Sequence, residues 1–243
     1  MTDMNLGAAP VVLVTGSTRG IGAGIVDALR ARGARVIGHG RNGGPDSIGA
    51  DLGMPGAPAA LWDAALAQVG GQIDVLINNA GQFSDNPVDT PDCAWLDAWE
   101  ETLRINLTAA AQLSRAAVLH WQANGRPGRI VHIASRAAHR GDSPDHWHYA
   151  AAKGGMIALH KTIARGYAHQ NILSFAISPG FVATDMAADY LATNDAAALA
   201  AQIPLGRVAT PQEIARIAVF CAIDAPASMT GTVIDANGAS YVR

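Results

Sequence analysis

Short apolar runs alternate with longer amphipathic segments along most of this chain, and no other feature constrains its fold as strongly. Apolar runs of this kind predict strands that are buried on both faces, which is typical of a parallel sheet with helices on either side. The predicted strands lie at residues 11–14, 36–37, 74–77, 130–133, 173–177 and 232–234, with a weaker candidate at 47–50. The sequence therefore predicts an α/β fold with a Rossmann-type, doubly wound parallel sheet.

Amphipathic patterns between these runs predict the covering helices. One helix begins near Ile21, directly after a glycine-rich turn. A second has four residues at helical spacing on one face, namely Met156, Leu159, Ile163 and Tyr167. A third begins at Thr210, because Thr210 and Glu213 match a capping box and Pro211 suits the first turn.

Length and composition predict one compact domain over residues 1–243, with its core at about 11–238. The 243 residues are 49% hydrophobic and 15% charged, which is typical of a globular chain. The net charge of -3 and the absence of a basic tract argue against a nucleic-acid partner. We expect no secretory signal, membrane span, disulfide framework or metal site, and therefore a cytoplasmic protein.

The glycine-rich turn after the first strand, Thr-Gly-Ser-Thr-Arg-Gly-Ile-Gly at residues 15–22, predicts a dinucleotide site. Its glycines let the backbone turn tightly and approach a pyrophosphate, while the following helix N-terminus offers free N–H groups and a positive dipole end. We expect the cofactor to contact Gly16, Ser17, Thr18, Arg19, Gly20, Ile21 and Gly22.

Tyr149 and Lys153 predict acid–base chemistry. They lie four residues apart at the start of a helix, so both side chains share one face. A nearby ammonium favours the phenolate and lowers the tyrosine pKa from its usual value of about 10, which lets the phenol exchange a proton with an alcohol. Ser135 follows a predicted strand, where its hydroxyl can hydrogen-bond a substrate oxygen.

Several motifs in order resemble the single-domain members of the short-chain dehydrogenase/reductase family, over residues from about 11 to 238. They are the Thr-Gly-x-x-x-Gly-x-Gly turn, Asn78-Asn79-Ala80-Gly81, Asn106, Ser135, Tyr149-x-x-x-Lys153, and Pro179-Gly180 with Thr184. At the family level the chain also resembles 3-oxoacyl-carrier-protein reductases. Extended epimerases and dehydratases need further C-terminal residues for a substrate domain, so we expect the single-domain type.

The resemblance implies roles for residues beyond those motifs. It implies a catalytic tetrad of Asn106, Ser135, Tyr149 and Lys153, in which Asn106 holds a water that relays protons to the lysine. It implies further cofactor contacts from Asp51, Leu52, Asn79, Ala80, Gly81, Tyr149, Lys153, Pro179, Gly180, Val182 and Thr184. The expected substrate pocket holds Arg136, Ala137, Trp147, Phe181 and Met186, with residues 185–203 covering it. The resemblance also implies a homotetramer, or failing that a dimer.

The end of the second predicted strand favours NADP(H) over NAD(H). No acid stands there to bind the ribose hydroxyls, whereas Arg41 follows the strand and Arg19 lies in the glycine-rich turn. Guanidinium groups match the 2′-phosphate. We therefore predict an NADP(H)-dependent oxidoreductase that transfers a hydride between the nicotinamide and a small carbonyl or alcohol substrate. The alternatives are an NAD-dependent alcohol, sugar or steroid dehydrogenase and a catalytically silent dinucleotide sensor, although a sensor would be expected to have a damaged tetrad.

Overall fold

The fold is built on one parallel sheet of seven strands. A computed structural model describes residues 9–184 and 200–243. The strands are β1 (Val11–Val14), β2 (Arg35–Gly40), β3 (Ser47–Gly49), β4 (Val75–Asn78), β5 (Gly128–Ile133), β6 (Ile172–Pro179) and β7 (Val233–Ala236). Their order in the sheet is β3-β2-β1-β4-β5-β6-β7, and every neighbouring pair is parallel. The predicted α/β class and doubly wound sheet are confirmed.

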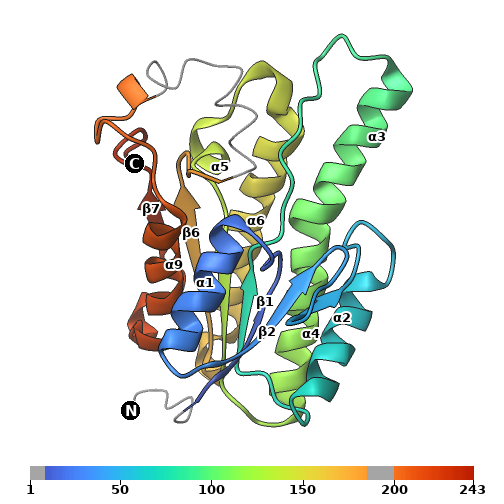
Figure 1. Cartoon of the computed structure of the whole chain (residues 1–243), viewed down its shortest axis with the longest axis vertical. Helices are drawn as coiled ribbons and strands as arrows, with labels where there is room; N and C mark the ends of the chain where they lie inside the picture. The colour runs from blue at the N-terminus through green and yellow to red at the C-terminus, as the bar shows by residue number, and fades with distance from the viewer. Residues whose placement is uncertain (1–8, 185–199) are drawn as a thin grey trace.

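Helices cover both faces of this sheet (Figure 1). The described helices include α1 (Gly20–Ala31), α2 (Ala57–Gln68), α3 (Asp92–Leu103), α4 (Ala109–Ala123), α5 (Ala137–Arg140), α6 (Trp147–Tyr167) and α9 (Pro211–Val219). Helices α1 and α9 pack together on one face, and α2, α4 and α6 lie on the other. A π-helical turn at Arg104–Thr108 joins α3 to α4.

Alternate residues of each central strand belong to different core layers. Val12 and Val14 pack with the residues of α1 and α9, whereas Leu13 packs with those of α2 and α4. Because side chains alternate across a strand and both layers are apolar, the strand reads as one uninterrupted apolar run. This is the physical origin of the pattern that predicted the fold.

The predicted start of α9 is confirmed by its capping geometry. The Glu213 N–H donates to the Thr210 hydroxyl oxygen at 3.2 Å, and the Thr210 N–H donates to the Glu213 carboxylate at 2.8 Å. These reciprocal bonds satisfy backbone groups that the first helical turn otherwise leaves without partners.

The connection between β2 and β3 is unusually short for parallel strands. Such a pair normally needs a crossover of a dozen or more residues, but here residues 41–46 make the link. The link can be short because only the last residues of β2, from Gly38 to Gly40, pair with β3. Arg41 and Asn42 therefore stand at the carboxyl end of β2, and no helix separates β2 from β3.

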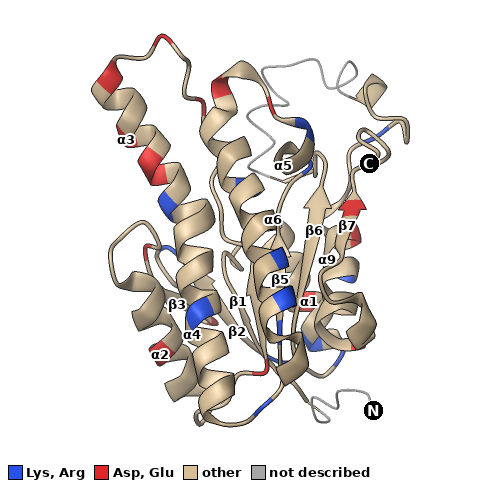
Figure 2. Cartoon of the chain, turned by 180° about the vertical axis from the view of Figure 1, so that it is seen from behind, with Lys and Arg blue, Asp and Glu red and all other residues tan. Residues whose placement is uncertain are grey.

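Charge is unevenly distributed over the surface. The outward faces of α4 and α6 carry few charged residues, whereas acidic residues gather along α3 (Figure 2). Among the helices of the described residues, none combines the length and the apolar character needed to cross a membrane.

Candidate active site

A cavity of about 1090 Å³ opens at the carboxyl ends of the strands, where ligands of doubly wound sheets bind. The predicted site residues that line it are Gly16, Thr18, Arg19, Gly20, Ile21, Gly22, Arg41, Asp51, Leu52, Asn79, Ala80, Gly81, Ser135, Arg136, Tyr149, Lys153, Pro179, Gly180, Phe181, Val182 and Thr184. Ser17, Asn106, Ala137 and Trp147 do not line it. Met186 and most of the predicted covering segment lie outside the described residues.

The glycine-rich turn packs too closely against the turn after β4 for larger residues. A Cβ at Gly16, whose φ is +63°, would lie 2.8 Å from the Cα of Ala80. A Cβ at Gly22 would lie 2.0 Å from the carbonyl oxygen of Gly16. The Asn79 side-chain amide donates to the carbonyls of Thr15 and Gly16, both at 2.9 Å, and locks the two turns together.

The N-terminus of α1 faces the same cavity without a cap. Arg19 makes no side-chain capping bond, and the first turn contains no acidic residue. Gly20, Ile21 and Gly22 line the cavity at this point. Uncapped N–H groups and the positive end of the helix dipole suit an anionic group such as a pyrophosphate, so these residues fit a dinucleotide.

His39 supports the glycine-rich turn, a role that the sequence did not reveal. Its Nδ1 accepts from the Gly16 N–H at 3.1 Å, and its Nε2 donates to the Ala50 carbonyl at 2.9 Å. Burial lowers the pKa of His39, which favours the neutral ring that these bonds require. The Ser17 hydroxyl accepts from the His39 N–H at 2.9 Å, which explains why Ser17 points away from the cavity.

Arg41 and Asp51 form a loose, exposed pair at the edge of the cavity. The Arg41 Nε lies 3.9 Å from the Asp51 carboxylate, and the side chains are 61% and 43% exposed. Such a pair contributes little energy, so Arg41 can exchange this partner for a ligand. Arg19 also lines the cavity, and with Arg41 it supplies two guanidinium groups.

Tyr149 and Ser135 come together from the start of α6 and the end of β5. Burial raises the pKa of the Tyr149 phenol to about 12, and a hydrogen bond with the Ser135 hydroxyl offsets only part of this rise. The Lys153 ammonium lies 5.7 Å from the centre of the Tyr149 ring. The Tyr149 pKa is therefore raised, whereas the sequence predicted that it would be lowered. Loss of hydration disfavours the phenolate more than the neighbouring groups stabilise it.

Lys153 is buried beneath the tyrosine. Its Nζ donates to the Ile133 carbonyl at 2.8 Å, and burial lowers its pKa to about 8. A Cβ at Gly81 would lie 3.7 Å from the Lys153 Nζ and 2.9 Å from the Asn106 Oδ1. Glycine at position 81 therefore lets the cavity wall lie directly against both side chains.

Asn106 lies in the π-helical turn between α3 and α4 and is fully buried. Its Oδ1 accepts from the Gln82 N–H at 2.8 Å, and its Nδ2 donates to the Gln82 carbonyl at 2.9 Å. The side chain thereby holds the segment after Gly81 in place. Its predicted part in a proton relay stays a prediction.

Four residues join two loops beside Tyr149. The rings of Phe83 and His146 stack at 3.8 Å, and the Tyr149 ring meets Phe83 edge-on at 4.9 Å. His146 also contacts the Ser143 hydroxyl at 2.6 Å through Nδ1 and the Asp85 carboxylate at 3.2 Å through Nε2. We call Phe83, Asp85, Ser143 and His146 the loop clamp; Phe83 and Ser143 line the cavity.

Two predicted pocket residues lie elsewhere. Trp147 is 54% exposed and packs edge-on against Trp95 of α3, because the first turn of α6 points it away from Tyr149. Ala137 is 3% exposed and faces the protein interior. The histidines on either side of Trp147 differ in position. His146 stacks on Phe83, which lines the cavity, and His148 is buried.

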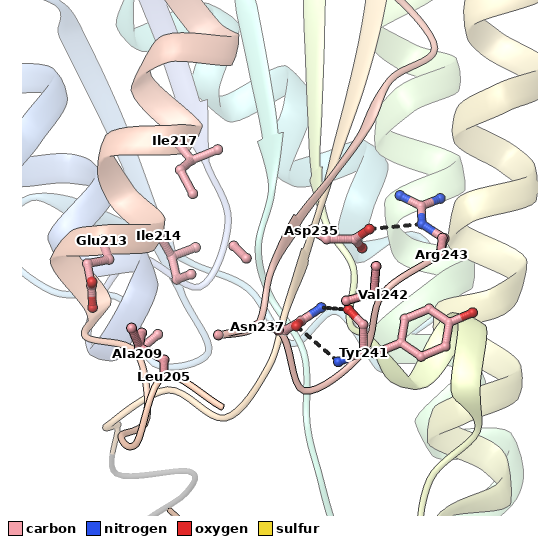
Figure 3. A pocket seen from close by; sticks show the side chains of 13 residues that line it. Leu205, Ala209, Glu213, Ile214, Ile217, Asp235, Asn237, Tyr241, Val242 and Arg243 are labelled. Atoms are coloured by element: carbon pink, nitrogen blue, oxygen red, sulfur yellow. Dashed lines mark hydrogen bonds and ion pairs between the residues drawn. The ribbon is translucent and has the colours of Figure 1, made fainter. Parts of the chain in front are cut away.

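A second cavity of about 390 Å³ lies between α9 and the C-terminal segment (Figure 3). The interactions that hold that segment include an ion pair of Arg243 with Asp235 at 2.9 Å and hydrogen bonds between the Asn237 side chain and the Tyr241 backbone. Of the predicted site residues that the structure describes, none lines this cavity.

Comparisons with known proteins agree with this geometry. A family model described as enoyl-(acyl carrier protein) reductase matches residues 16–238. The 3-oxoacyl-(acyl-carrier-protein) reductase of Escherichia coli K12 is 35% identical and aligns over 96% of this chain and 97% of its own. That of Vibrio harveyi is 36% identical and aligns over 98% and 100%.

Solved structures of similar proteins share the fold across nearly the whole chain. A Beutenbergia cavernae protein assigned as an NAD(P)-dependent gluconate 5-dehydrogenase, with bound NADP, has a TM-score of 0.85 and 33% identity over 95% of this chain and 96% of its own. A variant of actinorhodin polyketide ketoreductase with NADPH has a TM-score of 0.84 and 25% identity over the same shares.

The sheet, the glycine-rich turn and the buried tyrosine–lysine pair define an oxidoreductase of the dinucleotide-binding α/β class. The chain belongs to the short-chain dehydrogenase/reductase family.

Proposed function

We propose that this protein is an NADP(H)-dependent oxidoreductase that interconverts a small carbonyl compound and its alcohol. One observation carries the proposal: a single cavity holds Ser135, Tyr149 and Lys153 together with a glycine-rich turn, the uncapped start of α1, and arginines in that turn and at the end of β2. The NADP and NADPH of the two similar structures support the choice of cofactor. Arg19 and Arg41 supply positive charge for a 2′-phosphate, as do the guanidinium groups of other NADP sites.

The proposed chemistry divides between the cofactor and the chain. Bound NADPH would supply the hydride that reduces the carbonyl carbon. Ser135 hydrogen-bonds the substrate oxygen, and Tyr149 gives that oxygen its proton as negative charge develops on it. The raised pKa of Tyr149 keeps the phenol protonated at neutral pH, which suits reduction. Lys153, bonded to the Ile133 carbonyl, places positive charge beneath the phenolate that remains.

The test measures reduction of a panel of ketones and aldehydes with NADPH and with NADH, in the wild type and in Tyr149→Phe. We expect turnover with NADPH, and a kcat at least about a hundredfold lower in Tyr149→Phe because only the proton donor is lost. NADPH affinity should change little. Tyr167→Phe, at the far end of α6 and outside the cavity, is the matched control.

The outcomes separate the three functions. Equal efficiency with NADH would favour the NAD-dependent dehydrogenase. Binding of NADPH without turnover of any carbonyl or alcohol substrate would favour the dinucleotide sensor. Substantial activity in Tyr149→Phe would refute the assigned proton donor.

We further propose that the protein is a cytoplasmic homotetramer. The sparsely charged outer faces of α4 and α6 (Figure 2), with Leu119 48% exposed, support a subunit interface there. The C-terminal segment with Val242, 76% exposed, supports a second one. Cys93 and Cys221 are both free thiols, as is usual in a reducing compartment. Light scattering should report four subunits, and a monomer at micromolar concentration would contradict the proposal.

A further inference from the structure

We infer that His39 is a positioning residue for the cofactor, and that its ring sets the affinity of the cavity for NADP(H) by joining the turns after β1 and β3 at the end of β2. This inference rests on the proposed NADP(H)-dependent function and assigns part of its cofactor binding to a residue outside the glycine-rich motif. Both turns and the end of β2 contribute residues to the wall of the cavity. His39 itself lines that wall and is 3% exposed.

The hydrogen bonds of the sheet do not reach the first residues of the glycine-rich turn. The pairing of β1 with β2 ends at Val14 and Gly38, so the backbone beyond Val14 needs other partners. The Gly16 N–H donates to the His39 Nδ1 at 3.1 Å, and the His39 Nε2 donates to the Ala50 carbonyl at 2.9 Å. One side chain therefore links the turn after β1 to the turn after β3, where the sheet no longer does so.

Glycines on both sides of His39 let the glycine-rich turn approach this closely. A Cβ at Gly38 would lie 2.6 Å from the Ser17 Oγ, and a Cβ at Gly40 would lie 2.5 Å from the Thr18 Cγ2. Because side chains alternate across a strand, the His39 ring lies on the opposite face of β2. The turn thus packs against one face of the strand end, while the ring holds the start of the turn from the other face.

Backbone bonds hold position 39 against the same turn whatever its side chain. The Ser17 N–H donates to the His39 carbonyl at 2.8 Å, and the His39 N–H donates to the Ser17 hydroxyl oxygen at 2.9 Å. Replacing the ring removes only its own bonds to Gly16 and Ala50. A substitution at position 39 therefore tests the ring separately from the pairing of the two segments.

The segments that the ring joins carry residues expected to contact the cofactor. Gly16 opens the glycine-rich turn, Arg41 lies two residues beyond His39, and Asp51 directly follows Ala50. A site whose walls are already held in place loses less conformational entropy when it binds a ligand. Without the ring, the cofactor itself would have to order these segments, and its affinity would be lower.

The test measures the Kd of NADP⁺ by calorimetry and the Kd of NADPH by fluorescence, both at neutral pH. His39→Leu keeps an apolar side chain of moderate size but makes neither bond, and His39→Asn is too short to join the two turns. Each should raise both Kd values by about tenfold or more, because two hydrogen bonds are lost. His39→Gln, which has an acceptor and a donor, should retain part of the affinity. At saturating NADPH, kcat for a carbonyl substrate should stay within a few-fold of the wild type.

His160→Leu is the matched control, because His160 is fully buried, contacts the Ser174 hydroxyl at 2.8 Å and does not line the cavity. It should lower the melting temperature while leaving both Kd values unchanged. If binding weakens as much in His160→Leu as in His39→Leu, the loss reflects stability alone and the inference is wrong. If one His39 variant does not fold, the other gives the same comparison.

The remaining outcomes separate this inference from the proposed function. Wild-type Kd values in His39→Leu or His39→Asn would overturn the inference and leave the function intact. Binding of NADP⁺ and NADPH that depends on His39, without turnover of any carbonyl compound, would refute the function alone, because the Kd is measured without substrate. A wild-type protein that binds neither NADP⁺ nor NADPH would refute both.

Discussion

Arg41 extends from the end of β2 without a following helix to support it, and its partner Asp51 is 3.9 Å away and exposed. We expect Arg41→Ala to lower kcat/KM for NADPH by about ten- to a hundredfold, because a charge-assisted bond to the 2′-phosphate contributes about 1.5–3 kcal/mol. The value for NADH should change little. The measurement is the ratio of kcat/KM for the two cofactors in both proteins, and an unchanged ratio would show that Arg41 does not contact the phosphate.

The reverse change has to account for Thr18. Gly40→Asp would offer a carboxylate to the ribose of NAD, but a Cβ at Gly40 would lie 2.5 Å from the Thr18 Cγ2. The double variant Gly40→Asp with Thr18→Ser removes that methyl group and should shift preference toward NADH. Gly40→Ala with Thr18→Ser is its uncharged control. A shift of the same size in the control would mean that packing, rather than charge, sets the preference.

At the scale of elements, the loop clamp determines how the loops after β4 and before α6 meet beside Tyr149. The Asn86 N–H donates to the Asp145 carbonyl at 2.8 Å, and the stacked Phe83 and His146 rings form a second contact between the two loops. We expect His146→Ala to lower kcat/KM for the carbonyl substrate by about tenfold, because loss of the stack and both polar contacts frees Phe83. NADPH affinity should be unchanged.

His146→Phe distinguishes the two parts of the clamp, since it keeps an aromatic ring but removes the contacts to Ser143 and Asp85. Most of the activity should survive in this variant if stacking positions Phe83. Activity as low as in His146→Ala would assign the positioning to the polar contacts. Wild-type activity in His146→Ala would show that the loops are ordered without His146.

At the scale of the whole molecule, buried neutral histidines make stability depend on pH. His132 and His160 are fully buried between the sheet and the helices α4 and α6, and burial lowers their pKa values from 6.5 to about 3 and about 4. Below pH 6.5 the unfolded chain binds protons that the folded chain does not. The free energy of unfolding should therefore be greatest above pH 6.5 and fall as the pH drops toward 4, on the order of 1 kcal/mol per pH unit for each histidine.

Urea denaturation at several pH values across this range measures that slope. His132→Gln and His160→Gln should each give a shallower dependence, because one group that protonates only on unfolding has been removed. His169→Gln, at an exposed position, should keep the wild-type slope. Identical slopes in all four proteins would mean that other groups control the acid sensitivity.

The sequence by itself determined the class of fold and most of the cavity lining. Strands such as Val11–Val14 could be predicted because both of their faces are buried, which gives an uninterrupted apolar run. The start of α9 could be predicted because its capping residues are close together in the sequence. The glycine-rich turn could be placed because its constraint, the close approach of backbone atoms, is met only by glycine. Tyr149 and Lys153 could be paired because helical spacing alone puts them on one face.

Only the tertiary structure decided what depends on neighbours that are distant in the sequence. It placed His39 under Gly16, turned Trp147 away from the pocket, joined Phe83 to His146, and positioned Arg136 against Ser240. It also reversed the expected direction of the Tyr149 pKa, because burial depends on how the whole chain packs around the phenol. The spacing of residues in the sequence predicts which side chains share a face of one helix or strand. Desolvation and contacts between separate loops arise only once the chain has folded.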